Sequence, residues 1–153
     1  MTVAVGLLGH CGSGDGPLPP MDTADVGLDS DAVGSFCDVP AALEAFAVGV
    51  RPYIATCRPC HDMTVAPALR KAPGPPWFHP TSDETVLNTL IQWELVHPTE
   101  PASSLFLLKP LPLRNGGLAH AGGDWIEPQT PAYDGFLNFL DHAAPCAGNV
   151  RGR

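Results

Sequence analysis

Two cysteines and a histidine stand together near the middle of the chain, as Cys57-Arg-Pro-Cys60-His61. Two thiols three positions apart on one local turn can each add across a vinyl group of the same porphyrin, and the adjacent imidazole can then bind the iron as its proximal ligand. This C-x-x-C-H spacing is the attachment sequence of c-type haem. The pentad therefore predicts one covalently bound haem c, with Cys57 and Cys60 as attachment residues and His61 as a ligand of the metal.

Three other interpretations of the pentad stay open at this stage. A thioredoxin-like dithiol needs a preceding strand and a helix N-terminus that lowers the thiol pKa, whereas the segment before Cys57 has helical periodicity. A zinc site needs four ligands, and only Cys57, Cys60 and His61 are close in sequence. A structural cysteine pair without a cofactor is the third. The helices predicted on either side of the pentad favour haem.

The second axial ligand of a haem iron is normally a methionine or a histidine. The chain has three methionines, Met1, Met21 and Met63. Met63 lies only two residues after His61 and cannot reach the opposite face of the macrocycle. The other two belong to the N-terminal part of the chain, so a methionine ligand is not expected.

Among the other histidines, His120 has the surroundings best suited to a flat cofactor. It lies in the segment 115–123, which reads Asn-Gly-Gly-Leu-Ala-His-Ala-Gly-Gly. Glycines on both sides let the backbone approach a planar group closely. We therefore expect His120 as the distal ligand and second metal ligand. His79, His97 and an open or water-bound site are the alternatives.

Hydrophobic spacing predicts a helix immediately before the pentad. Apolar residues recur at helical intervals over 41–57, and Pro52 is expected to kink or break this segment. Pro40 suits the first helical turn, with Asp38 or Val39 at the cap position.

Two further helices are predicted downstream. Thr81 and Glu84 form a capping box before an apolar periodic run. Trp93 is expected to fill the core, and a position covering the haem is the alternative. The Pro-rich segment 72–80 is expected to be a loop that wraps the porphyrin edge. The last amphipathic stretch follows Thr130-Pro131, with an apolar stripe formed by Tyr133, Phe136, Leu137 and Leu140.

Length and composition agree with one small helical domain. The chain has 153 residues, of which 44% are hydrophobic, with 16 glycines and 18 prolines. These numbers support a core but require long loops. We predict an all-α, cytochrome c-like haem domain with three to five short helices and long loops rich in proline and glycine. An N-terminal and a C-terminal helix packed together beside the haem is the general plan of cytochrome c.

Charge and missing motifs exclude several function classes. The formal net charge is −8, which argues against a nucleic-acid partner. Neither a GxxxxGK[ST] phosphate loop nor a GxGxxG turn is present, so nucleotide binding has no support. The sequence also lacks an apolar run of about 18 residues, so no membrane-spanning helix is expected.

The first 36 residues differ from the rest of the chain. Residues 1–50 contain seven acidic residues and no Lys or Arg, whereas residues 51–153 contain nine acidic and eight basic residues. We interpret 1–36 as a leader and flexible acidic tether. A short apolar stretch followed by Cys11 resembles the end of a lipoprotein signal, so Cys11 is a candidate for lipidation and membrane anchoring. A frayed N-terminus is the alternative.

Several segments together resemble a family of small c-type cytochrome domains found in secreted proteins of myxobacteria and planctomycetes. The resemblance covers about residues 41–143 and implies that His120 is the distal ligand. This chain has Ala121 where the family usually has glycine. The segments that carry it, in order, are Val50-Arg-Pro-Tyr-Ile54, Cys57–His61, Pro101-Ala-Ser-Ser-Leu105, Leu107-Leu-Lys-Pro-Leu111, His120-Ala-Gly-Gly123 and the final aromatic helix.

Cys37 and Cys146 bracket the predicted haem domain, which we place at 37–147 with a tail at 148–153. If the first and last helices pack together, the two thiols can approach, and we expect a disulfide because haem attachment already implies an oxidising compartment.

The expected function is one-electron transfer with redox partner proteins in the periplasm or elsewhere outside the cytoplasm, without enzymatic activity. The alternatives are a ligand-binding or enzymatic haem domain with an open distal site, and a structural interaction module stapled by haem.

Overall fold

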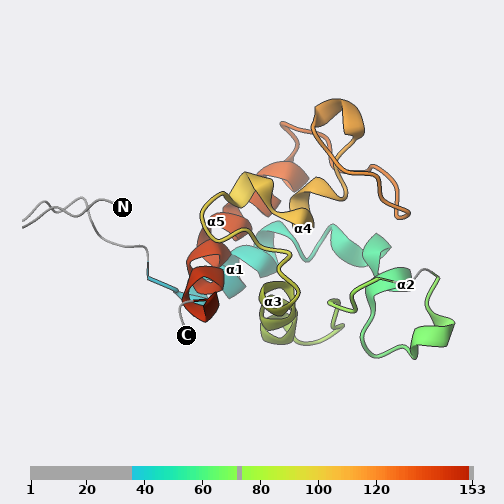
Figure 1. The fold of residues 1–153 in the computed structure, drawn as a ribbon, viewed down its shortest axis with the longest axis horizontal. Coiled ribbons are helices and arrows are strands. Elements are labelled where there is room, and N and C mark those ends of the chain that lie inside the picture. The colour runs from blue at the N-terminus through green and yellow to red at the C-terminus, as the bar shows by residue number, and fades with distance from the viewer. Residues whose placement is uncertain (1–35, 72–73, 152–153) are drawn as a thin grey trace, which may run out of the picture. The chain divides into compact units, whose positions relative to one another are not determined.

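The computed structural model describes residues 36–71 and 74–151 (Figure 1). Within these ranges the chain forms helices and turns joined by long loops, and its β-structure consists of one isolated bridge between Asp62 and Phe78. The predicted all-α class is therefore confirmed. In chain order the elements are α1 (Val39–Gly49), η1 (Ile54–Cys57), α2 (Arg58–His61), η2 (Pro67–Leu69), α3 (Asp83–Gln92), η3 (Pro101–Ser103), α4 (Leu105–Leu108), η4 (Leu113–Asn115) and α5 (Pro131–Arg151).

Helix α1 begins at a side-chain cap and ends before the pentad. The Asp38 side chain accepts a hydrogen bond from the Ala41 backbone N–H at 3.0 Å, and proline occupies the first turn. The helix ends at Gly49, earlier than the helical spacing over 41–57 suggests. Pro52 has no N–H to donate and cannot continue the helical ladder. The chain turns there and resumes as the short 3₁₀ turn η1.

Helices α1 and α5 pack against each other, as expected from their two apolar stripes (Figure 1). The rings of Phe46 and Phe139 meet edge to face across this interface, with centroids 5.1 Å apart. The two backbones touch where Gly49 lies against Gly135, because a Cβ added to Gly135 would lie only 2.2 Å from the carbonyl oxygen of Gly49. Glycines at both positions therefore set the closest approach of the two helices.

Helix α3 begins one residue later than the predicted capping box. Ser82, not Thr81, is the N-cap, and its Oγ accepts a hydrogen bond from the Thr85 N–H at 3.1 Å. Glu84 lies in the first turn, where a negative charge suits the helix N-terminus. A serine and a threonine in consecutive positions offer two equivalent caps, so the sequence pattern does not select between them.

The core combines residues from the helices with two aromatic residues of the Pro-rich loop. Trp77 and Phe78 are buried, whereas Trp93 is 51% exposed. The expectation that Trp93 fills the core is therefore wrong. Trp93 is the C-cap residue of α3, so it lies beyond the last helical residue and does not continue the buried face of that helix. Fully buried core side chains include those of Phe46, Ile54, Leu87, Leu90, Leu107, Ile126, Phe136, Phe139 and Leu140.

Contacts between Cα atoms place all described residues in one unit, Val33–Arg153. The expected tether and the lipidation candidate Cys11 lie outside the described residues. At the other end, α5 continues to Arg151, so the expected boundary after residue 147 falls inside this helix. No helix in the described part of the chain is both long and apolar enough to cross a membrane.

Candidate functional site

The pentad folds into one compact turn. Cys57 is the last residue of η1, and the next four residues form α2, which ends at His61. Both Cys57 and Cys60 are half-buried and carry free thiols. Because one helical turn takes 3.6 residues, the spacing of three places both thiols on the same side of the turn.

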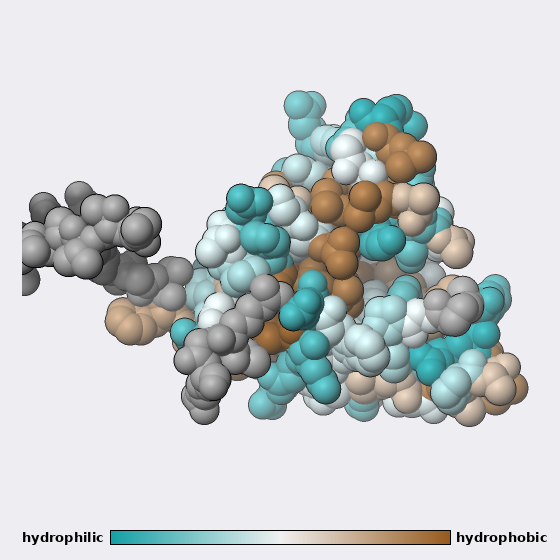
Figure 2. Space-filling view, in the orientation of Figure 1, coloured by the Kyte–Doolittle hydropathy of each residue, from teal (hydrophilic) through white to brown (hydrophobic). Residues whose placement is uncertain are grey.

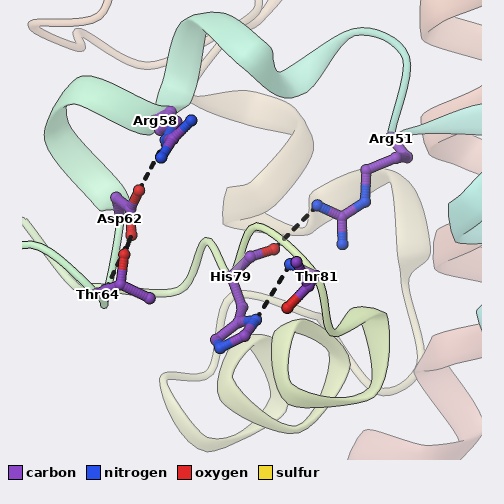
Figure 3. A network of polar contacts seen from close by, with 6 residues as sticks. All are labelled: Arg51, Arg58, Asp62, Thr64, His79 and Thr81. Carbon is purple, nitrogen blue, oxygen red and sulfur yellow. Dashed lines mark hydrogen bonds and ion pairs between the residues drawn. The ribbon is translucent and has the colours of Figure 1, made fainter.

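A buried carboxylate fixes the chain at the end of α2 (Figure 3). The Asp62 side chain is fully buried and accepts a hydrogen bond from Arg58 Nε at 2.8 Å. It also accepts from the Thr64 hydroxyl and backbone N–H. These bonds from Thr64 and Arg58 hold the pKa of Asp62 below its usual value despite burial. The ionised carboxylate thus anchors the residue next to His61.

A second polar network in the same view joins the end of α1 to the loop that follows the pentad (Figure 3). The Arg51 guanidinium donates to the His79 carbonyl at 2.9 Å and pairs with Asp83 at the start of α3. It also lies over the ring of Phe78, 5.6 Å from the centroid. Arg51 therefore links the end of α1, the Pro-rich loop and the start of α3.

The His61 imidazole is held on two sides by the Pro-rich loop. Its Nδ1 lies 2.8 Å from the carbonyl oxygen of Pro75, and its ring stacks on Trp77 with centroids 5.2 Å apart. A carbonyl oxygen only accepts hydrogen bonds, so Nδ1 carries the proton and Nε2 keeps the lone pair of the neutral ring. A Cβ on Gly74 would lie 3.0 Å from His61 Cε1, so glycine allows this close approach.

Backbone hydrogen bonds position that loop against α2. The Phe78 N–H donates to the His61 carbonyl and the Met63 N–H donates to the Phe78 carbonyl, each at 2.9 Å. This bridge brings a segment distant in sequence beside the pentad.

Cys57, Cys60 and His61 line a cavity of about 320 Å³ whose wall is mainly apolar. The cavity wall is made by η1, α2, α4, α5 and the loops between the helices. Figure 2 shows apolar residues forming a band across one face of the molecule. Four aromatic side chains provide most of its flat surface: Trp77, Phe106, Trp125 and Phe136. Their rings contact one another, with centroids 5.0 Å apart for Trp77 and Phe106 and 5.0 Å apart for Phe106 and Phe136.

His120 reaches the cavity from a loop whose two ends are attached to the last residue of α4 and to Pro110 just after this helix. The Leu118 N–H donates to the Leu108 carbonyl, and the N–H groups of Trp125 and Ile126 donate to the Pro110 carbonyl. These bonds close the segment between residues 118 and 125 into a loop that presents His120 toward the pentad.

The imidazoles of His61 and His120 face each other within this cavity. Their ring centroids are 6.0 Å apart and the ring planes differ by 21°. A metal–nitrogen bond is about 2 Å long and a ring centroid lies about 1 Å behind its nitrogen, so two imidazoles bound to opposite sides of one ion have centroids about 6 Å apart. The two centroids here are separated by a distance of that size, and the small angle between the ring planes is that of stacked rings.

The other histidines of residues 36–71 and 74–151 do not line this cavity. His79 Nδ1 accepts a hydrogen bond from the Thr81 N–H, and His97 Nδ1 accepts from the Glu100 N–H. His142 is exposed on α5 and lines a shallow groove instead. Met63 also lies outside the cavity lining. Of the candidate second ligands, the structure therefore places His120 alone opposite His61 within the described ranges.

Burial affects the two ends of the site in different ways. It raises the pKa of the Cys57 thiol to about 11, so this thiol is protonated at neutral pH. A catalytic dithiol of the thioredoxin type needs a thiol whose pKa is lowered, not raised. Burial, together with the nearby His61 and Lys109, lowers the pKa of His120, which keeps its imidazole neutral and able to ligate.

Lys109 is the charged side chain in the cavity lining of the described residues. It is half-buried, and its Nζ lies 3.4 Å from the Ala119 carbonyl oxygen, beside the His120 loop. A cation in an otherwise apolar wall is suited to an occupant that carries a carboxylate at its edge.

The donor set fits a haem c group, because two thiols, two imidazoles and four aromatic side chains line the cavity. The Nδ1 atom of His120 is buried and has no hydrogen-bond partner among the described residues. Within the same ranges, no three His, Cys, Asp or Glu side chains converge to hold a metal ion by themselves.

Cys37 and Cys146 lie away from this cavity and form a disulfide, with Cα atoms 4.4 Å apart. It joins the residue before the α1 cap to α5, the same two helices that meet at Phe46 and Phe139. The crosslink therefore fastens the helix pair that supports one wall of the site.

Sequence reasoning missed several residues that shape the site. Gly74 and the Pro75 carbonyl hold His61, and Lys109 and Trp125 complete the wall near His120. The aromatic pair Trp77-Phe78 in a Pro-rich loop was the available signal, since large aromatic residues there are expected to be buried. Comparison of the chain with protein-family models, with curated proteins and with solved structures gives no match.

Proposed function

We propose that this chain is a mono-haem c-type cytochrome domain that carries single electrons between redox partner proteins outside the cytoplasm. The observation that carries the proposal is the His61–His120 pair, whose rings are 6.0 Å apart in a cavity that both free thiols also line. When bound, haem supplies an iron centre that accepts and releases one electron.

Cys57 and Cys60 hold the porphyrin. Each thiol would form one thioether by addition to a vinyl group of that porphyrin, with the sulfur bonded to the vinyl carbon beside the ring and the thiol hydrogen transferred to the terminal carbon. The addition is neutral in electrons and needs no external oxidant.

His61 and His120 would bind the iron from opposite faces. The bond from His61 Nδ1 to the Pro75 carbonyl orients the ring and increases its basicity as a ligand. Two imidazoles favour ferric iron more than a His–Met pair does, so we expect a comparatively low reduction potential. With both axial positions filled by protein, the domain is expected to be an electron carrier and not an enzyme.

The apolar wall would exclude water and protect the thioether-bound group. Trp77, Phe106 and Phe136 belong both to the cavity lining and to the hydrophobic core. Export is supported by the Cys37–Cys146 pairing, since disulfides persist in oxidising compartments. Lipidation of Cys11 would then anchor the exported domain to a membrane.

The test is to produce the full chain with haem-maturation machinery and measure its intact mass, pyridine haemochrome and redox titration. We expect the added mass of one haem, a haemochrome typical of two thioethers, a low-spin spectrum without a methionine-to-iron band, and a one-electron couple. The double variant Cys57→Ser/Cys60→Ser should lack covalent haem, whereas His97→Ala should retain it. A colourless wild-type product with the mass of the unmodified chain would contradict the proposal.

A further inference from the structure

The two imidazoles of the site are held very unequally. His61 follows Cys60 directly, its Nδ1 bonds to the Pro75 carbonyl at 2.8 Å, and its ring stacks on Trp77. His120 Nδ1, although buried, has no hydrogen-bond partner within the described residues. Partners of this kind orient a ligating imidazole, and losing one typically weakens metal binding about 10–100-fold.

The loop that carries His120 is held mainly at its ends. The chain has left-handed conformations at Gly116 and Gly123, with φ of 84° and 81°, which lie on either side of His120. Residues 118, 119 and 121–124 are exposed, so few packing contacts hold the middle of the loop. The bonds to Leu108 and Pro110 hold only its ends.

The surroundings of His120 are suited to a small uncharged ligand. Ala119, Ala121 and Trp125 line the cavity beside it and offer no side-chain charge. The one cation nearby, Lys109, has its Nζ directed to the Ala119 carbonyl. Since Lys109 is suited to a carboxylate of the bound group itself, a second anion at this end of the cavity would lack a partner, whereas an uncharged diatomic molecule would not require one.

We propose that His120 is a displaceable ligand, which leaves the iron so that a small uncharged diatomic molecule binds in its place while His61 stays bound. This inference rests on the proposed haem function. Exchange breaks one metal–imidazole bond and forms one metal–ligand bond, without change of oxidation state. The domain would thereby couple electron transfer to the presence of a dissolved gas, because displacing an imidazole changes the iron's reduction potential.

The experiment uses the reduced, haem-loaded full chain mixed rapidly with carbon monoxide at increasing concentrations. In wild-type protein the rate of binding should rise and then saturate, because departure of His120 becomes limiting. Ethyl isocyanide, a different entering ligand, should reach the same limiting rate. In His120→Ala the rate should rise linearly and exceed the wild-type limit at least tenfold.

The matched control is His142→Ala, which removes an exposed histidine outside the cavity and should bind carbon monoxide as the wild type does. The wild-type protein could stay low-spin and bind no carbon monoxide while His120→Ala binds it. This result would overturn the proposal that His120 is displaceable and would leave the haem function intact. A linear, unsaturated wild-type rate would overturn it as well, since the position would then already be open. The wild-type concentration dependence decides the matter even if His120→Ala fails to accumulate.

Failure of the haem function has a different signature. A product without the added haem mass would overturn both proposals together. Low-spin His120→Ala with wild-type kinetics would show that His120 is not the ligand and would overturn the displacement inference.

Discussion

The backbones of Gly49 and Gly135 touch where α1 crosses α5. A Cβ on Gly135 would lie 2.2 Å from the Gly49 carbonyl oxygen and 2.8 Å from its Cα. Backbone atoms cannot rotate away as a flexible side chain can, so any added atom must push the two helices apart. This contact sets how closely α1 and α5 approach each other.

Gly135→Ala is therefore expected to destabilise the folded protein, although alanine is the better helix former by about 1 kcal/mol. Overpacking costs about 1–3 kcal/mol, so after the gain in helix propensity we expect a net loss of up to about 2 kcal/mol in a urea denaturation series. Gly148→Ala is the matched control, because its nearest neighbour would be Pro98 Cβ at an ordinary 3.8 Å. Equal stabilities for the two variants would show that the crossing tolerates a Cβ.

Removal of the disulfide should also weaken the fold without changing the site. Cys37 and Cys146 are 109 positions apart, so their bond restricts a long loop of the unfolded chain. The double variant Cys37→Ser/Cys146→Ser should lose about 2–5 kcal/mol of unfolding free energy. Its visible spectrum at room temperature should match the wild type, because neither cysteine lines the cavity. An altered spectrum would show that the crosslink also shapes the site.

Lys109 should raise the reduction potential of the bound haem. A nearby positive charge in an apolar wall favours the reduced iron, which carries one less positive charge. We expect Lys109→Met to lower the equilibrium constant for reduction about tenfold, equivalent to about 59 mV for one electron. Lys71→Met, which removes an exposed lysine outside the cavity lining, serves as the control in the same redox titration. Equal potentials for the two variants would refute this role.

Gly122 should be required for His120 to face the cavity. A Cβ at this position would lie 2.5 Å from His120 Cε1, closer than real contacts allow. Gly122→Ala is therefore expected to displace the imidazole and convert the low-spin spectrum to a high-spin one. Gly74→Ala is a milder test on the other imidazole, because a Cβ there would lie 3.0 Å from His61 Cε1. Its spectrum should stay low-spin, since the Pro75 carbonyl holds the His61 ring. Retention of a low-spin spectrum in Gly122→Ala would argue against this arrangement.

The Cys57 thiol should become reactive only at high pH in haem-free protein that retains its helical circular dichroism. The usual thiol pKa of 9.0 is raised to about 11 by burial. The folded chain therefore keeps the proton between about pH 9 and 11 while the unfolded chain loses it, so this group's contribution to stability falls as pH rises through that window. Alkylation of Cys57, followed by peptide mass analysis, should rise toward pH 11 in folded protein and near pH 9 in urea. The same pH profile in both conditions would contradict the shift.

The parts of the structure that follow local rules were accessible from the sequence. The helix before the pentad, its Asp38 cap and the C-terminal helix follow from spacing and capping chemistry. Pairing of α1 with α5 follows from two apolar stripes that must cover each other. The position of His120 among glycines was a usable signal because glycine alone allows such close backbone approach.

The rest depends on contacts that leave no side-chain pattern. The Pro75 carbonyl that holds His61 is a backbone atom, and every residue has one. Trp77 and Trp93 are both tryptophans, and the residue type does not distinguish them. Trp77 is buried and Trp93 is exposed because of where the Pro-rich loop and α3 end. The choice of Ser82 over Thr81 as a cap likewise turns on a shift of one residue in the chain path.

The shared wall of cavity and core has a consequence for protein turnover. Phe106 and Phe136 serve both, so a group that fills the cavity would complete the packing of the interior and stabilise the native state. Chains that have not acquired their group would unfold more often and be cleared by proteases. We expect the amount of this protein in a cell to rise and fall with the supply of tetrapyrrole, independently of its transcription.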